Sequence, residues 1–231
     1  MTLDRFFEAA ALCLDGRPWP AGGARPADQD MDFYVEAAAR EGPRLLEELF
    51  PLTRRACARW RPGRDLWPEL ASAFSRAHGS RHWDPNARGS ELCAFLRAQW
   101  ARGAELPPAL DDLADYEWRC HLLAVSPAAF DPARERVNPN LSLQAYSPSI
   151  LEWVPALAPC GAVPFPLLVC LFRVGEGEVR WLRPSPAELG ALALARGEID
   201  AGALADNGLT GPALREAAGR LAELGILGAA Q

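Results

Sequence analysis

The last quarter of the chain changes its hydrophobic period, and this change constrains the fold more than any other feature of the sequence. Residues 164–174, PFPLLVCLFRV, form an apolar, β-branched and aromatic run that is too short for a buried helix. Residues 175–177, GEG, supply the positive-φ positions of a tight reversal, and residues 178–183 then return with alternation of period two. The pattern predicts a β-hairpin.

After the hairpin the period becomes helical, and three helices are predicted. Residues 185–188, SPAE, form a capping box with proline at the first helical position, so a helix begins there and ends at Gly197. A second, short helix spans residues 199–206. A third begins near Thr210, ends at Gly225 and carries one apolar face, made of Leu214, Ala217, Ala218, Leu221 and Leu224.

The N-terminal half has helical periodicity throughout. Pro51 interrupts one of its predicted helices and should kink or restart it. The predicted helices cover residues 3–14, 30–40, 45–60, 64–78, 89–100 and 106–124. We therefore expect an all-α bundle over residues 1–125.

A connector rich in proline and asparagine follows, from residue 126 to residue 162. Residues 141–146 and 150–154 within it are strand-like and could extend the hairpin to a three-stranded sheet. The predicted fold class is α+β: the helical bundle, then a second domain over residues 126–231 with a hairpin or three-stranded sheet and three helices.

Composition limits the classes of function. The chain has 231 residues, of which 49% are hydrophobic, and its net charge of −6 disfavours a duplex DNA partner. No apolar run approaches the roughly 20 residues that span a bilayer. Asp4, Arg5 and Glu8 interrupt any signal-peptide core. We expect a cytoplasmic protein without a membrane partner.

The residues of catalytic and metal sites do not form recognisable patterns. Six cysteines lack metal-ligand spacing, and residues 79–81, GSR, break the helix between His78 and His82. Glu117 is interpreted as a partly buried carboxylate bound to an arginine such as Arg88 or Arg54. The alternative, a catalytic acid, is disfavoured because no second carboxylate accompanies it. The sequence contains no GxSxG, GxGxxG or P-loop motif. We expect neither catalytic residues nor a metal or cofactor in this chain.

The hairpin followed by three helices is the layout of winged-helix domains. Some of these bind DNA, and others are the peptide-recognition elements that act in the maturation of ribosomally made, post-translationally modified peptides. The run over residues 184–227, PSPAELGALALARGEIDAGALADNGLTGPALREAAGRLAELGIL, resembles the three-helix half of such a recognition element. The resemblance implies that a leader peptide adds a strand to the hairpin edge and rests against the third helix.

The helical half carries a second resemblance. The segments ELFPLTRRAC, LWPELASAFSRAH, SELCAFLRAQ and LPPALDDLADYEW are similar to a bacterial helical-domain family that carries a DNA-binding label. Its members often serve as partner proteins of multinuclear non-heme iron oxidative enzymes, as in methanobactin and thiaglutamate biosynthesis. This resemblance implies a heterodimer in which the helical domain docks the enzyme and the enzyme holds the iron.

The strand after the turn is the expected peptide edge. Val179 and Trp181 share one face of it, while Arg180 and Leu182 share the other. We expect Arg180, Arg183 or Arg215 to meet acidic leader residues. The predicted peptide-binding residues are Val179, Arg180, Trp181, Leu182, Arg183, Leu214, Arg215, Ala218 and Leu221.

Two functions follow from these observations. The first is a non-catalytic partner subunit that binds a precursor peptide by strand addition and presents a cysteine-containing core to an iron-dependent oxidative enzyme. The alternative is a winged-helix transcriptional regulator that binds DNA. The third helix offers only Arg215 and Arg220, flanked by Glu216 and Glu223, and this pattern disfavours contact with phosphates.

Overall fold

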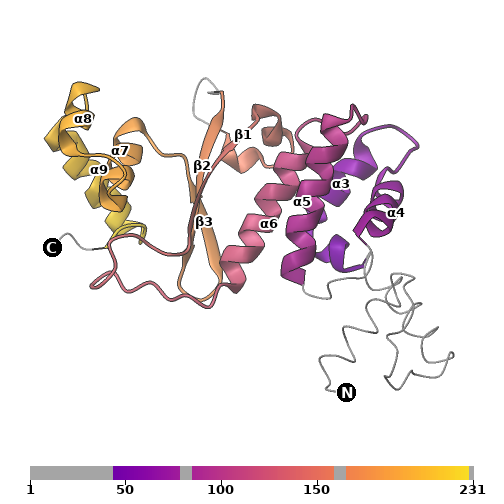
Figure 1. Ribbon diagram of the computed structural model, residues 1–231, viewed down its shortest axis with the longest axis horizontal. Helices are drawn as coiled ribbons and strands as arrows, with labels where there is room; N and C mark the ends of the chain where they lie inside the picture. The colour runs from indigo at the N-terminus through magenta and orange to yellow at the C-terminus, as the bar shows by residue number, and fades with distance from the viewer. Residues whose placement is uncertain (1–43, 79–84, 159–164, 229–231) are drawn as a thin grey trace, which may run out of the picture. The chain divides into compact units, whose positions relative to one another are not determined.

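The computed structural model describes residues 44–78, 85–158 and 165–228 (Figure 1), and the chain divides into two compact units, residues 1–118 and 119–231. Helices and an antiparallel sheet are both present, so the predicted α+β class is confirmed. The helices predicted over residues 3–14 and 30–40 lie outside the described residues. The division falls inside one helix, α6 (Leu110–Val125). The domain boundary predicted from the sequence, at residue 126, instead follows the end of this helix.

Unit 1 is helical over its described residues. A helix over residues 44–49 is followed by α3 (Pro51–Arg59), α4 (Trp67–His78), α5 (Pro85–Ala101) and the first part of α6. Phe50 has φ −128° and ψ 53°, which no helix accommodates, and Pro51 begins α3 as its first residue. The restart predicted at Pro51 is confirmed. None of the described helices is long and apolar enough to cross a bilayer.

Two helices of unit 1 begin later than predicted, for local reasons. The Asp65 carboxylate accepts a hydrogen bond from the backbone N–H of Trp67 at 3.0 Å, so the chain becomes helical only after Asp65. Ala109 has a φ of 56°, and this left-handed residue separates the preceding prolines from α6. The sequence pattern therefore located these helices, but cap geometry decided their first residues.

A close approach joins α5 to the first part of α6. A Cβ atom added to Gly89 would lie 2.1 Å from the ring of Trp118, so only glycine fits at this position. Beyond this contact, Arg97 donates from Nη2 to Oδ1 of the buried Asp115 at 2.7 Å. The largest fully buried side chains of the unit are Phe50, Phe74, Leu92, Leu96, Leu110 and Leu113.

The buried Glu117 on α6 caps α3. Its Oε1 accepts a hydrogen bond from the N–H of Leu52 at 2.6 Å, and its Oε2 accepts bonds from the N–H and Oγ1 of Thr53 at 2.8 and 2.6 Å. The first amides of a helix have no partner inside it and carry its positive dipole end, so they suit a carboxylate. A single side chain thus fixes the beginning of α3 to α6.

The predicted arginine partners of Glu117 are wrong. Arg54 pairs with Asp65 at 2.9 Å, and Arg88 lies over the ring of Phe74 with its Cζ 5.7 Å from the centroid. The helix N-terminus serves Glu117 because backbone amides donate without the side-chain ordering that an arginine requires. Nothing in the residue pattern marks a carboxylate that caps a distant helix.

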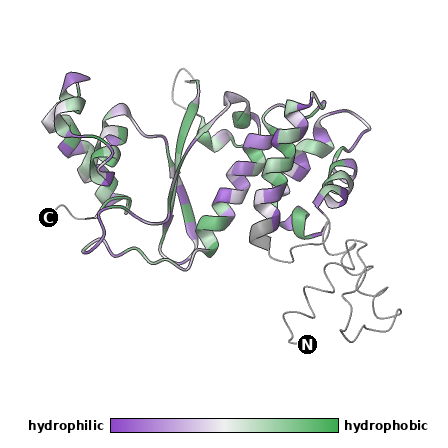
Figure 2. Cartoon of the chain, in the orientation of Figure 1, coloured by the Kyte–Doolittle hydropathy of each residue, from purple (hydrophilic) through white to green (hydrophobic). Residues whose placement is uncertain are grey.

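Unit 2 contains a three-stranded antiparallel sheet in the order β1-β2-β3. Its strands are β1 (Leu141–Tyr146), β2 (Leu167–Val174) and β3 (Glu178–Leu182). Gly175 and Gly177 adopt φ of 56° and 83° in the turn between β2 and β3. The hairpin and the three-stranded sheet are confirmed. Figure 2 shows that hydrophobic residues dominate β2.

One predicted strand, over residues 150–154, is wrong. Residues Pro148–Glu152 form a 3-10 helix, η1, and Pro155–Leu157 form another, η2. The Ser147 side chain accepts a hydrogen bond from the N–H of Ser149, and proline occupies the first position of each turn. These local turn signals outweigh the β-branched residues of the segment.

Three helices follow the sheet: α7 (Pro186–Arg196), α8 (Ala201–Asp206) and α9 (Gly211–Glu223). The predicted capping box is present, because Ser185 Oγ accepts from the N–H of Glu188 at 3.2 Å and the Glu188 carboxylate accepts from the N–H of Ser185 at 2.7 Å. Gly197 ends α7 with φ 71°. Glu188 also lies 3.3 Å from the guanidinium of Arg220, so the cap of α7 is tied to α9.

The core of unit 2 lies between one face of the sheet and the helices. Cys170 and Phe172 of β2 pack there against Leu192 of α7 and Leu221 of α9. Ala191, Ala217, Ile226 and Leu227 complete this buried cluster. Since all of these residues are at most 6% exposed, the middle of this face of β2 is covered.

The connector is fixed to the rest of unit 2 by a buried asparagine. Asn138 donates from Nδ2 to the carbonyls of Arg173 at 3.1 Å and Gly225 at 2.9 Å, and its Oδ1 accepts from the N–H of Asn140 at 2.8 Å. Val137 forms an isolated β-bridge with Leu227 beside it. One side chain therefore holds together the connector, the end of β2 and the residues after α9.

We predict that Asn138→Ala destabilises unit 2 by about 2–4 kcal/mol, because three hydrogen bonds are lost and two partly buried carbonyls lose their donor. Urea unfolding measures this change. The matched control is Asn207→Ala, which removes one exposed bond to Ala203 and should cost less than about 0.5 kcal/mol. Equal losses in the two variants would contradict the assigned role of Asn138.

Glu117 predicts a dependence of stability on pH. Burial raises the pKa of the Glu117 carboxyl, and the hydrogen bonds from Thr53 and Leu52 lower it by less. Because the folded pKa exceeds the unfolded value of about 4.3, the contribution of this group to stability is fully present below that value. The contribution is lost as pH rises through the folded pKa.

The test compares the wild type with Glu117→Gln in urea unfolding between about pH 4 and pH 8. Glutamine cannot titrate, and its misplaced amide adds only an offset that is independent of pH. We expect the stability of the wild type relative to the variant to fall as pH rises. A difference that grows with pH would refute the direction of the pKa shift.

Candidate functional site

The outer edge of β3 is the most exposed edge of the sheet. Among the described residues β3 pairs only with β2, so every second N–H and C=O of β3 points outward. Glu178, Arg180 and Trp181 are exposed on this strand of five residues. At the other edge β1 exposes only Ala145. The β3 edge thus presents backbone groups and side chains together.

The register with β2 assigns the side chains of β3 to two faces. Arg180 lies opposite Phe172 and Leu182 opposite Cys170, so both are on the face that packs against α7 and α9. Trp181 lies opposite Leu171 and Val179 opposite Arg173, on the second face. The two-face pattern read from the sequence is the observed one.

The last part of α6, residues 119–125, lies over the second face of the sheet. Arg119 donates from Nη1 to Ser142 Oγ at 3.3 Å, and Ser142 lies opposite Leu171 on that face. The carbonyl of Ala124 comes within 3.6 Å of a Cβ position at Gly177. Large apolar side chains remain exposed on this side of unit 2: Trp181 at 37%, Leu122 at 38% and Val125 at 52%.

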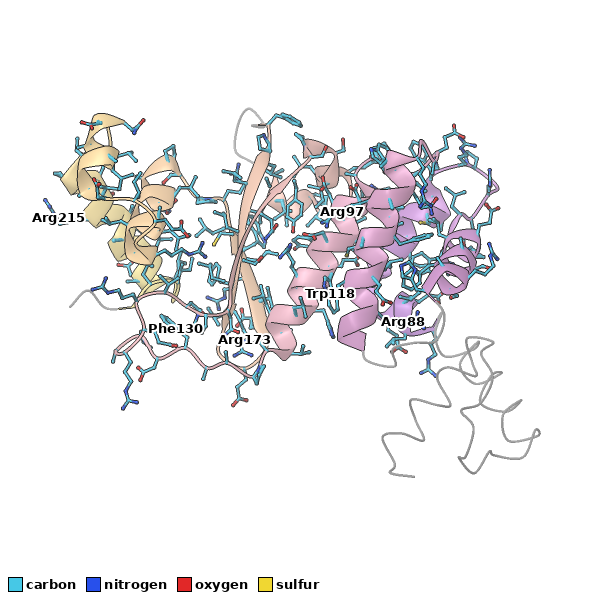
Figure 3. All side chains as sticks on the ribbon, viewed as in Figure 1. Arg88, Arg97, Trp118, Phe130, Arg173 and Arg215 are labelled. Carbon is cyan, nitrogen blue, oxygen red and sulfur yellow. The ribbon has the colours of Figure 1, made fainter. Side chains whose placement is uncertain are left out.

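The predicted groove between Trp181 and α9 does not form, because Trp181 and the core of α9 lie on opposite faces of the sheet. On α9, Leu214 and Leu221 are buried at 8% and 2% exposure. Ala218 packs at the border of the same core. Arg215 is exposed and points away from the sheet (Figure 3). Of the predicted residues on β3, only Arg180 and Leu182 lie on the sheet face that packs against α9. Arg183 follows β3 and is half-buried.

The structure adds a groove of about 840 Å³ at the hairpin end of the sheet. Its walls come from the connector, the hairpin and the end of α9: Ala124, residues 126–130, Asn138, Asn140, residues 173–177, Arg180 and residues 223–225. Figure 3 shows Phe130 and Arg173 at this end. The volume is in the upper part of the range found for ligand sites, roughly 300–1,000 Å³.

A polar network holds the walls of this groove. The guanidinium of Arg173 donates from Nη1 to the carbonyl of Ser126 and from Nη2 to that of Ala128. Ala128 also accepts a hydrogen bond from Asn140 Nδ2 at 2.9 Å. Asn138 and Asn140 are each only 3% exposed. These contacts preorganise the connector, so a ligand would not have to order it.

No local pattern in the sequence indicates this groove. Residues 137–140, VNPN, are typical of a turn, and no local signal distinguishes a turn asparagine from one that holds three segments. The two bonds of Asn138 to Arg173 and Gly225 span 35 and 87 residues. The only sequence signal for a connecting role of Asn138 is the number of polar residues in the connector.

Two cysteines and two histidines among the described residues are wholly or partly buried. Burial raises the pKa of the thiols of Cys57 and Cys170 to about 12, so both remain protonated near neutral pH. The ring of His78 stacks on Phe74, and burial lowers the pKa of His121. In the described ranges, no three His, Cys, Asp or Glu side chains are grouped closely enough to hold a metal ion.

The β3 edge thus offers unpaired backbone groups, and the hairpin groove offers apolar and polar walls beside it. A comparison of the sequence with known protein families and with curated proteins finds no match to either.

Proposed function

We propose that unit 2 binds an extended precursor peptide as a fourth strand along β3. The observation that carries this proposal is the outer edge of β3, which pairs with no further strand among the described residues. An edge of unpaired amides and carbonyls is a template for an added strand. The order of sheet, α7, α8 and α9 supports a winged-helix-like peptide-recognition domain.

Backbone pairing alone would bind such a peptide weakly. About 4–6 hydrogen bonds at roughly 0.5–1.5 kcal/mol each do not exceed the cost of association by much. Side chains on both sides of β3 therefore have to contribute. Val179 and Trp181 offer apolar area on one side, and Arg180 with Leu182 offers a charge and an apolar contact on the other.

The chain as a whole is proposed to be a non-catalytic partner of a multinuclear non-heme iron oxidative enzyme. The support is the order of the two resemblances, a helical unit followed by a recognition unit, with the enzyme docked by the former. In this proposal the iron and the oxidative chemistry belong to the enzyme, and this chain holds the peptide.

The DNA-binding alternative has less support. The exposed face of α9 carries two arginines and two glutamates: Arg215, Arg220, Glu216 and Glu223. Arg220 is also paired with the buried Glu188. A helix that docks on phosphates needs an excess of positive charge, which this face lacks.

Co-purification of the chain with the product of the neighbouring gene tests the partner role. We expect a stable complex that contains iron, whereas the purified chain alone contains none. Metal analysis and size-exclusion chromatography measure both quantities. A chain that stays monomeric beside the neighbouring product would overturn the partner role, and a titration with duplex DNA would then test the alternative.

Trp181→Ala tests the edge itself. We expect about tenfold weaker binding of the precursor peptide encoded in the same gene cluster, because an exposed aromatic anchor is lost. Fluorescence anisotropy with the labelled leader segment measures the affinity. The matched control is Trp100→Ala in unit 1, where the tryptophan is 48% exposed and binding should not change. Equal effects of the two substitutions would contradict strand addition at β3.

A further inference from the structure

The hairpin groove and the β3 edge share a residue, Arg180. Its side chain lies on the α9 side of β3, and it also lines the groove. The turn at residues 175–177 forms another part of the groove wall, directly before β3 begins. The groove therefore adjoins the Glu178 end of β3.

We infer that the groove is the second half of the peptide site and receives the segment of the peptide that extends beyond the Glu178 end of β3. This inference rests on the proposed strand addition. It also assigns a chemical pattern to the peptide: one carboxylate opposite Arg180, followed by apolar side chains that enter the groove.

The charges of the groove specify a single acidic residue. The Arg173 guanidinium is engaged by two backbone carbonyls, which leaves Arg180 as the accessible cation at the mouth. Arg180 is 53% exposed and pairs with Glu178 at 2.8 Å, so an incoming carboxylate can exchange with Glu178. Glu176 and Glu223 also line the groove and would repel a run of acidic residues.

Apolar contacts account for the remaining part of the pattern. Pro127, Phe130, Val174 and Leu224 line the groove around its charged mouth. A binding site of this kind buries apolar side chains and uses a few polar groups for orientation. Since the connector is already fixed by Asn138 and Asn140, the walls need not be ordered when the peptide binds.

The test uses a phage-displayed library of random 12-residue peptides selected on the full chain. The strongest binder is synthesised whole and in versions shortened from either end, and each is titrated against four variants. Phe130→Ala removes an apolar wall, Arg180→Glu reverses an exposed charge, and Trp181→Ala alters the strand edge. Arg134→Glu is the matched control, since it makes the same charge change on an 85% exposed side chain that does not line the groove.

We expect selected peptides with one acidic residue next to apolar ones. Phe130→Ala and Arg180→Glu should each weaken the whole peptide about tenfold, and Arg134→Glu should not. One shortened peptide should lose its sensitivity to Phe130→Ala and keep its sensitivity to Trp181→Ala. Arg180→Glu concerns an exposed residue, so its effect does not depend on whether Phe130→Ala folds.

Other outcomes separate the two proposals. If only Trp181→Ala weakens binding, the groove does not receive the peptide, and strand addition at β3 remains in place. Sensitivity to Phe130 and Arg180 without sensitivity to Trp181 would overturn the continuity of edge and groove, and strand addition with it. A selection that yields no peptide would overturn both.

Discussion

Burial of β2 on both faces is the constraint on which unit 2 depends. Cys170 and Phe172 lie in the core shared with α7 and α9, while Val169 and Leu171 on the opposite face are also fully buried. A central strand covered in this way can be reached only through its neighbours in the sheet. The exposed backbone of the sheet is thus confined to its edges, and β3 has the more exposed one. The proposed function is a consequence of this arrangement.

Buried polar side chains hold the elements around this sheet and in unit 1. Asn138 joins the connector to β2 and to the residues after α9, and Glu117 joins α6 to the beginning of α3. Glu188 caps α7 and meets Arg220 of α9. Asn138 and Glu117 each satisfy backbone groups that are far away in sequence and that would otherwise lack a partner inside the fold. Their satisfaction gives the segments one arrangement rather than several.

The same network shapes the proposed peptide site. A strand edge alone is a weak and unselective receptor, because backbone groups are alike in every peptide. Selectivity requires side chains and a preformed cavity near the edge, and the fixed connector creates one at the hairpin turn. Arg180 lies on β3 and also lines the groove. A charge at that position orients a bound chain, while the apolar walls beyond it supply contact area.

The sequence by itself determined the types and order of the described elements, except for the two 3-10 helices η1 and η2, where it predicted a strand. The capping box at residues 185–188, the glycine turn at residues 175–177 and the restart at Pro51 are interactions between residues within four positions of each other, so local pattern reveals them. It also revealed which residues alternate along β3. Only the tertiary structure decided that Trp181 lies on the face away from α9, that α3 supplies the partner of Glu117, and that the connector closes a groove. The hydrogen bonds of Asn138 and Glu117 among these contacts span 35 to 87 residues, and the side chains that make them are not distinguished by their neighbours in the chain.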